Sequence, residues 1–269
     1  MDDEDFMRRA IELAERGRYS VRPNPLVGCV LVRAGEIIAE GWHDHLGGLH
    51  AEQMAIADAE SRGVETQGAI AYVTLEPCNH FGRTPPCSEA LMWAGVKKVV
   101  IGAADPNPIV RGGGLEALKR EGIDIEIGIL EKECNQQMFA FMHWCKYRRP
   151  YVLLKAATDN NGRIDGDPEK PAVRFSSKES LEMVHQIRRD SMAIIVGVNT
   201  VIRDDPKLTV RAEKISASDI IPKRIVIYEN KINMPVFFVF HFEFRCVFTQ
   251  MANYYIPIRF TTYKFPYSF

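Results

Sequence analysis

The feature that most constrains this chain is the alternation of short β-rich runs with helical segments of about ten residues. The β-rich runs cover residues 27–32, 37–39, 69–74, 96–102 and 123–130, and the expected helices cover 3–17, 51–63, 88–94 and 114–121. Ala34-Gly35, between the first two runs, is a turn signal and predicts a hairpin. Strands that alternate with helices predict a layered α/β sheet.

A second pattern of this kind begins after the polar segment 147–150. We expect a strand over 151–156, a helix over 179–189 and a strand over 193–198. The sequence therefore predicts two α/β domains, residues 1–146 and residues 150–228, followed by an aromatic-rich tail.

The tail, residues 229–269, differs from the rest in composition. All 19 glycines lie at or before Gly197, so the last 72 residues hold none, and nine of the 14 phenylalanines lie between Phe237 and Phe269. The preferred interpretation is a frameshifted or truncated reading frame from about residue 229. A replacement domain or an oligomer interface is the alternative. A membrane-surface anchor is disfavoured, because no basic amphipathic helix is visible.

Charge and cysteine content exclude several classes of protein. With 34 basic and 35 acidic residues, the formal charge of −1 removes the simplest electrostatic argument for nucleic-acid binding. No apolar run reaches the roughly 18 residues of a membrane span, and the acidic N-terminus is unlike a secretory signal. Six cysteines are too few for a disulfide scaffold. We expect a cytoplasmic protein whose reduced cysteines are free to bind metal.

Three side chains form a candidate metal site. His50 lies at an expected helix start, Cys78 follows the strand over 69–74, and Cys87 lies at the start of the next helix. One histidine and two thiolates form a three-ligand zinc set with a fourth position open to water. Glu52 need not be a ligand and is the candidate catalytic group, because a carboxylate beside such a site can move a proton.

Each piece taken singly has a simpler interpretation, since an isolated Cys78 or Cys87 is more often a small buried hydrophobe. The ordered combination is typical of zinc-dependent nucleobase deaminases. Eight residues, 79–86, separate the two cysteines, whereas the usual spacing in that class is two. The ligand types favour Zn²⁺ without excluding iron.

Several motifs together carry a family resemblance. They are Pro23-Asn24-Pro25, Gly41-Trp42-His43, His50-Ala51-Glu52, residues 74–87 (TLEPCNHFGRTPPC) and residues 105–108 (DPNP). Over residues 3–145 the chain closely resembles the deaminase half of bifunctional riboflavin-biosynthesis deaminase/reductases, although Leu49 stands where that family usually has proline. The resemblance implies a cytidine-deaminase-like three-layer α/β/α domain. It also implies deamination of 2,5-diamino-6-ribosylamino-4(3H)-pyrimidinone 5′-phosphate.

Polar side chains near these motifs are candidate substrate contacts, because polar groups must pair with the pyrimidine edge. They are Asn24, His43 and His80. The simpler alternatives are a turn role for Asn24 between two prolines and a solvated strand end for His43. Asp105 and Asn107 are expected only to cap their loop.

Residues 151–211 resemble the start of the family's reductase half, which is similar to dihydrofolate reductase in fold. The resemblance implies that Phe175, Thr200 and Asp204 lie near NADPH, and that Arg188, Leu208 and Arg211 lie near the phosphorylated substrate. Arginine suits a phosphate because its guanidinium binds two oxygens at once. Asn161 replaces an acid of the family pattern.

The resemblance ends after residues 223–227, before the glycine-rich segment that holds the cofactor phosphate in this family. A partial domain with impaired NADPH-dependent reductase activity is therefore expected, and two intact activities are the alternative.

Two further functions compete with these expectations. A deaminase of guanine, cytosine or tRNA adenosine would share the zinc set, but the long loop between the cysteines argues against it. A non-catalytic zinc-stabilised interaction protein would not need Glu52. The expected partners are a small phosphorylated pyrimidine, with no nucleic acid and no membrane, and the resemblance suggests a homo-oligomer.

Overall fold

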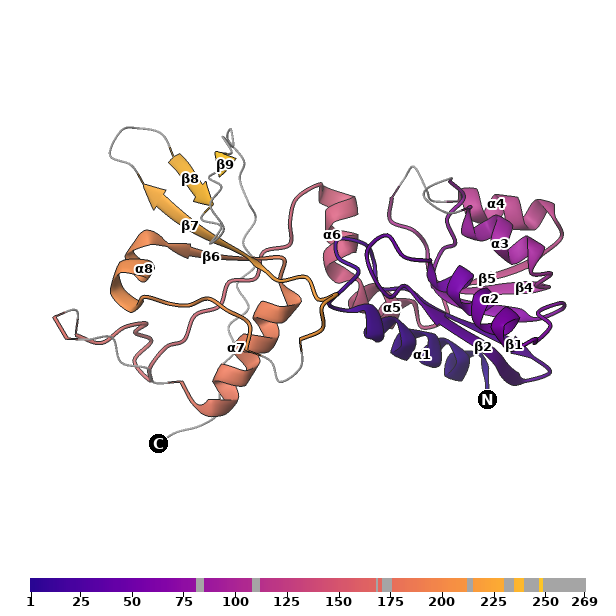
Figure 1. The fold of residues 1–269 in the computed structure, drawn as a ribbon, viewed down its shortest axis with the longest axis horizontal. Helices are drawn as coiled ribbons and strands as arrows, with labels where there is room; N and C mark the ends of the chain where they lie inside the picture. The colour runs from indigo at the N-terminus through magenta and orange to yellow at the C-terminus, as the bar shows by residue number, and fades with distance from the viewer. Residues whose placement is uncertain are drawn as a thin grey trace. The chain divides into compact units, whose positions relative to one another are not determined.

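The chain divides into two units, Met1–Tyr151 and Val152–Phe269 (Figure 1). The computed structural model describes residues 1–80, 85–107, 112–167, 169–170, 176–211, 215–229, 235–239 and 247–248. Within these ranges no helix combines the length and the apolar character needed to cross a membrane.

A five-stranded sheet in the order β2-β1-β3-β4-β5 forms the centre of the first unit. Its strands are β1 Gly28–Arg33, β2 Glu36–Trp42, β3 Ile70–Leu75, β4 Lys98–Ala103 and β5 Asp124–Ile127. β1 and β2 form the predicted hairpin, in which Ala34 and Gly35 both have positive φ, as a two-residue type I′ turn requires. β3 pairs antiparallel with β1 and parallel with β4, which in turn is parallel to β5.

Helices cover both faces of this sheet. They are α1 Asp3–Ala14, the short η1 Glu15–Gly17, α2 Ala51–Ser61, α3 Cys87–Trp93, α4 Gly113–Arg120, α5 Glu131–Gln137 and α6 Phe139–Tyr147. One buried cluster joins α1 and α5 to the sheet through Met7 and Cys134. The other joins α2, α3 and α4 to the opposite face through Ala55, Leu91 and Leu118 (Figure 1). The predicted three-layer α/β/α arrangement is confirmed.

The polarity of the strands determines where a site can form. Because β3 and β4 are parallel, their carboxyl ends lie at the same edge of the sheet, where α3 begins and where the chain after Leu75 leaves the core. All residues of β3 after Ile70 are buried, so this strand is a rigid support for the segment that follows it.

The second unit contains a four-stranded sheet in the order β6-β7-β8-β9. Its elements are α7 Lys178–Asp190, β6 Ala193–Gly197, α8 Val198–Asp204, β7 Lys223–Glu229, β8 Pro235–Val239 and β9 Val247–Phe248. β6 and β7 are parallel, and β8 pairs antiparallel with β7 and β9. The mixed α/β character is as predicted, whereas the rest of the tail beyond Glu229 lies outside the described residues.

The strand predicted over 151–156 is wrong. The structure has only an isolated bridge at Leu153 in this segment, and Tyr151, Leu153 and Leu154 are all more than one-third exposed. An apolar run becomes a strand only where a neighbouring strand edge satisfies its backbone groups.

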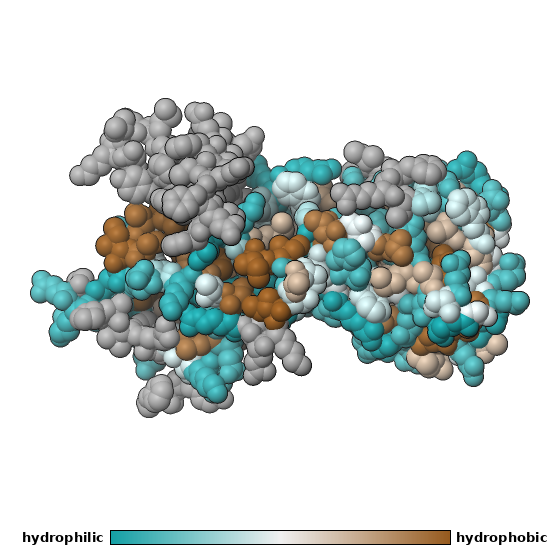
Figure 2. All heavy atoms as spheres, in the orientation of Figure 1, coloured by the Kyte–Doolittle hydropathy of each residue, from teal (hydrophilic) through white to brown (hydrophobic). Residues whose placement is uncertain are grey.

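The two units differ in how much apolar surface they bury. Among the described residues of the second unit, Leu208 is the one hydrophobic side chain in the buried class, whereas Ile195 is 54% and Ile202 78% exposed. Figure 2 shows hydrophobic residues at the surface around β6 and α8. The first unit, by contrast, has an extensive buried cluster on each face of its sheet.

Close contact between α1 and β1 gives a stability prediction. A Cβ atom at Gly28 would lie 1.9 Å from the carbonyl oxygen of Ala10, so Gly28→Ala must push the helix from the sheet. We expect a loss of about 1–3 kcal/mol in unfolding free energy, measured as a lower urea midpoint. Gly113→Ala is the control, because its Cβ would make only an ordinary contact with Asn79 at 3.6 Å. Equal midpoints for the two variants would contradict this packing.

Candidate metal centre

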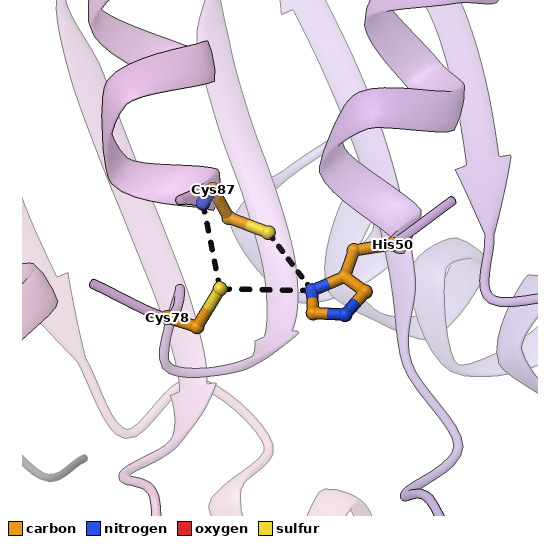
Figure 3. A group of neighbouring side chains, drawn as sticks. All are labelled: His50, Cys78 and Cys87. Carbon is orange, nitrogen blue, oxygen red and sulfur yellow. Dashed lines mark hydrogen bonds between the residues drawn. The ribbon is translucent and has the colours of Figure 1, made fainter. Parts of the chain in front are cut away.

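His50, Cys78 and Cys87 meet at the carboxyl edge of the sheet, as the sequence predicted (Figure 3). Their ligand atoms all lie within 4.8 Å of one another. His50 Nδ1 is 3.1 Å from Cys87 Sγ and 3.6 Å from Cys78 Sγ. Tetrahedral zinc with bonds of about 2.0 Å to nitrogen and 2.3 Å to sulfur separates its ligand atoms by about 3.5–3.8 Å. The donor set and its spacing therefore fit a zinc ion.

Each ligand is fixed by the start of a helix. His50 is the residue that precedes α2, and Cys87 is the first residue of α3. Cys78 belongs to neither helix, but the first turn of α3 holds it. The backbone N–H of Cys87 donates to Cys78 Sγ at 3.4 Å, and that of Ser88 donates to the Cys78 carbonyl at 3.1 Å. Exposed N–H groups at a helix start favour a thiolate at this position.

Gln53 connects the two helix starts and was missed by the sequence reasoning. Its Oε1 accepts from the backbone N–H of His50 at 3.3 Å, and its Nε2 donates to the Pro85 carbonyl at 2.8 Å. A glutamine three residues after a helix-capping position is the sequence signal that could have identified it.

The thiol of Cys78 is prepared to ionise. A hydrogen bond with the Cys87 side chain, together with the nearby His50, lowers the pKa of Cys78 to about 4. The same interaction with Cys78, and burial, raise the pKa of Cys87, and the hydrogen bond with Cys78 raises that of His50. The protein alone therefore already favours one thiolate at the site.

Glu52 lies in the first turn of α2 and is only 3% exposed. Burial, and then the negative charge of Cys78, raise the pKa of Glu52 to about 7. Its carboxylate also interacts with the Cys87 thiol. A carboxyl group in this place can hold or release a proton near neutral pH beside the ligand set.

Asn24 and His43 lie next to His50. The Asn24 amide is 3.2 Å from His43 Nε2, and His43 Nδ1 is 2.8 Å from the carbonyl oxygen of Leu49. Because a carbonyl only accepts, Nδ1 carries the proton and Nε2 accepts from Asn24. The rings of His43 and His50 are 5.6 Å apart. The idea that His43 is a solvated strand-end residue is wrong, since it is 4% exposed and burial lowers its pKa.

His80 is exposed, two residues beyond Cys78, and its charge acts on Asp105. The next four residues, 81–84, lie outside the described part of the chain. Asp105 Oδ1 accepts from the backbone N–H of Asn107 at 2.7 Å, which is the capping arrangement expected for this loop. Glu76, whose buried carboxylate contacts the same loop, was missed. An acidic residue directly after a buried strand is the sequence signal that could have identified it.

In the second unit, α7 and the segment after α8 approach each other at the predicted substrate residues. Arg188 Nη1 donates to the Thr209 carbonyl at 3.1 Å, next to Leu208, and the backbone N–H of Arg211 donates to His185 Nδ1 at 3.3 Å. Burial and the nearby Arg188 lower the pKa of Lys155.

The predicted cofactor residues of the second unit are placed only in part. Thr200 and Asp204 are exposed and lie four residues apart on α8, on one face of that helix. Phe175 lies outside the described residues.

Two family models match the chain, one in its first half and one in its second. The cytidine and deoxycytidylate deaminase zinc-binding region matches residues 1–103, and the RibD C-terminal domain matches residues 150–250. The second match thus continues past residue 228, where the resemblance read from the sequence ended.

Relatives that match most of the chain are named as riboflavin biosynthesis proteins. The riboflavin biosynthesis protein RibD of Actinobacillus pleuropneumoniae is 47% identical over 212 residues, 78% of this chain and 55% of that protein. That of Escherichia coli is 44% identical over 78% of this chain and 56% of its own length. The chain thus spans just over half the length of these curated relatives.

Solved structures show the same relationship. RibD of Acinetobacter baumannii has a TM-score of 0.79 and 43% identity, over 86% of this chain and 64% of that one. A Thermotoga maritima protein, titled a diaminohydroxyphosphoribosylaminopyrimidine deaminase/5-amino-6-(5-phosphoribosylamino)uracil reductase, has a TM-score of 0.75 and 38% identity over the same shares.

Fold and site together define a cytidine-deaminase-like zinc-binding domain joined to a second domain of dihydrofolate-reductase type. The second domain is of the kind that uses NADPH. The chain belongs to the RibD family of riboflavin-biosynthesis proteins.

Metal content tests the ligand set directly. We expect purified protein to carry about one zinc ion per chain and Cys87→Ala to carry almost none, because two ligands rarely hold zinc where three are needed. Elemental analysis by mass spectrometry gives the number. Cys134→Ala is the matched control, since Cys134 is equally buried but packs in the cluster with α1 and α5, on the other face of the sheet. Full zinc content in Cys87→Ala would show that Cys87 is not a zinc ligand.

Proposed function

We propose that the first unit catalyses zinc-dependent hydrolytic deamination of 2,5-diamino-6-ribosylamino-4(3H)-pyrimidinone 5′-phosphate to 5-amino-6-(5-phosphoribosylamino)uracil. The observation that carries this proposal is the buried Glu52 beside a histidine and two cysteines spaced for zinc. The family supports the choice of substrate, because the 38% identical Thermotoga maritima protein bears this deaminase name.

The residues of this chain divide the chemistry between them. Zinc, when bound by His50, Cys78 and Cys87, would bring the pKa of a water molecule toward neutrality. Glu52 would take a proton from the attacking water on its carboxylate and deliver it to the exocyclic nitrogen. The water oxygen then bonds to the ring carbon as the C–N bond breaks, and ammonia leaves rather than an amide anion. The burial of Glu52 keeps bulk water from competing for that proton.

The pyrimidine edge needs polar partners close to the ligands. Asn24 and His43 supply a hydrogen-bonded pair beside His50, and His80 follows Cys78 closely in the chain. We assign these three residues to substrate binding. The free thiols of Cys78 and Cys87 fit a reducing compartment such as the cytoplasm.

A deaminase of another base or nucleotide is the nearest alternative, and a zinc-stabilised interaction protein is the alternative without chemistry. Offering guanine, cytosine and the phosphorylated ribosylaminopyrimidine in parallel separates the first from our proposal. The homo-oligomer suggested by the resemblance stays a prediction, checked by light scattering of the purified chain.

Replacing Glu52 tests the catalytic assignment. We expect Glu52→Gln to lower the rate of ammonia release at least about a hundredfold, because the amide cannot carry the proton, while zinc content stays as in the wild type. Glu60→Gln, an exposed position on the same helix, is the control and should leave the rate unchanged. Undiminished ammonia release in Glu52→Gln would reject the role of Glu52 and favour a structural zinc.

We further propose that the NADPH-dependent reductase activity of this chain is impaired. The stretch after Gly197 contains no glycine for a phosphate cradle. Apolar side chains such as Ile195 and Ile202 are also exposed in the second unit. The substrate residues Arg188, Leu208 and Arg211 and the cofactor residues Phe175, Thr200 and Asp204 would then lie in a domain that binds NADPH weakly or not at all.

NADPH oxidation decides this second proposal. With the deaminated product present, we expect no loss of absorbance at the NADPH wavelength above that of a blank without enzyme. Steady oxidation that depends on the ribosylamino product would show that both activities are intact, and Arg188→Ala should then weaken substrate binding. Neither outcome affects the deaminase assignment.

A further inference from the structure

A buried carboxylate with no part in the proposed chemistry lies next to the metal centre. Glu76 is 3% exposed and lies between the end of β3 and Cys78. Its Oε2 accepts from the backbone N–H of Asp105 at 3.2 Å, and its Oε1 accepts from that of Gly112 at 2.5 Å. One side chain therefore binds both ends of the loop that joins β4 to α4.

The backbone around Glu76 is adapted to this arrangement. The N–H of Glu76 donates to the Ala103 carbonyl at 2.9 Å, which continues the β3–β4 pairing by one step. Gly112 precedes α4 with a φ of 84°, a conformation that favours glycine, and the start of a helix stabilises a nearby negative charge. At Gly114, a Cβ atom would lie 2.0 Å from the Pro77 carbonyl, so α4 lies directly against the segment that carries Cys78.

The residues held by Glu76 lie near the metal centre. Asp105, at one end of the loop, is 8% exposed, and the charges of both His80 and Cys78 act on it. Cys78 itself is held separately, by the first turn of α3. Loss of the Glu76 contacts would therefore release Asp105 and Gly112 without removing the bonds that fix the metal ligand.

We propose that Glu76 is a positioning residue that holds Asp105 and Gly112 together and so fixes Asp105 beside the substrate site. The clamp is a matter of geometry alone, and its effect on substrate rests on the deaminase function proposed above.

Glu76→Gln is the variant of choice, because it keeps the shape of the side chain but replaces one of the two accepting oxygens by an amide nitrogen. That nitrogen is a donor and would face a backbone N–H, so one of the two hydrogen bonds is lost. We expect a KM for ammonia release about tenfold higher, the effect of one lost charged hydrogen bond. We also expect kcat within about twofold of the wild type and unchanged zinc content, since Glu52 and the metal ligands are untouched.

Hydrogen exchange measured by NMR tests the contacts themselves. In Glu76→Gln, exchange should be about tenfold faster at the backbone amides of Asp105 and Gly112. Glu116→Gln, exposed on α4, is the control and should match the wild type.

Several outcomes would overturn the clamp. Wild-type exchange rates at both amides would do so, even with a raised KM, because the effect would not act through the loop. Lost zinc and a lower melting temperature with an unchanged KM would show a residue that only supports the fold. If the wild-type protein releases no ammonia, the proposed function fails, whereas the exchange rates of Glu76→Gln still decide whether the loop is clamped.

Discussion

The attachment of Cys78 to the first turn of α3 is the interaction on which the metal centre depends. Cys78 lies in an irregular segment, and such a segment has no preferred place of its own. Two backbone N–H groups, from Cys87 and Ser88, fix its sulfur and its carbonyl group. Since Cys87 begins the same helix, one turn of backbone supplies the second ligand and orients the first. His50 is then brought to both by α2, with Gln53 joining that helix to Pro85.

The buried acids around this junction have opposite roles. Burial raises the pKa of Glu52, and the one cationic side chain that opposes this rise among the described residues is the metal ligand His50. The carboxyl group is therefore able to exchange a proton. Glu76 instead accepts hydrogen bonds from the backbone N–H groups of Asp105 and Gly112 and so holds both ends of a loop. Both carboxylates are 3% exposed, so burial alone does not determine what a carboxylate does; the groups that face it do.

The two units differ in how completely helices bury the apolar side chains of their sheets. In the first unit, clusters on both faces bury the strands, and the site is built at an edge that cannot shift without disturbing them. In the described part of the second unit, the strands pair, but side chains such as Ile195 stay exposed. The match to the RibD C-terminal domain establishes the kind of domain, and the exposed apolar side chains support the proposal that its activity is impaired.

The sequence by itself determined the layered α/β fold of the first unit. It also pointed to His50, Cys78 and Cys87 as a metal site and to Glu52 as the acid beside it. Strand and helix periods are local, and metal ligands need particular side chains, so both are visible in the order of residues. Tertiary structure alone decided what depends on a distant partner. The run over 151–156 forms no strand because no described neighbour pairs with it beyond one bridge. His43 can be buried because Asn24 and the Leu49 carbonyl form hydrogen bonds with its two ring nitrogens. Glu76 holds a loop whose far end lies 36 residues away, a contact that no local pattern encodes.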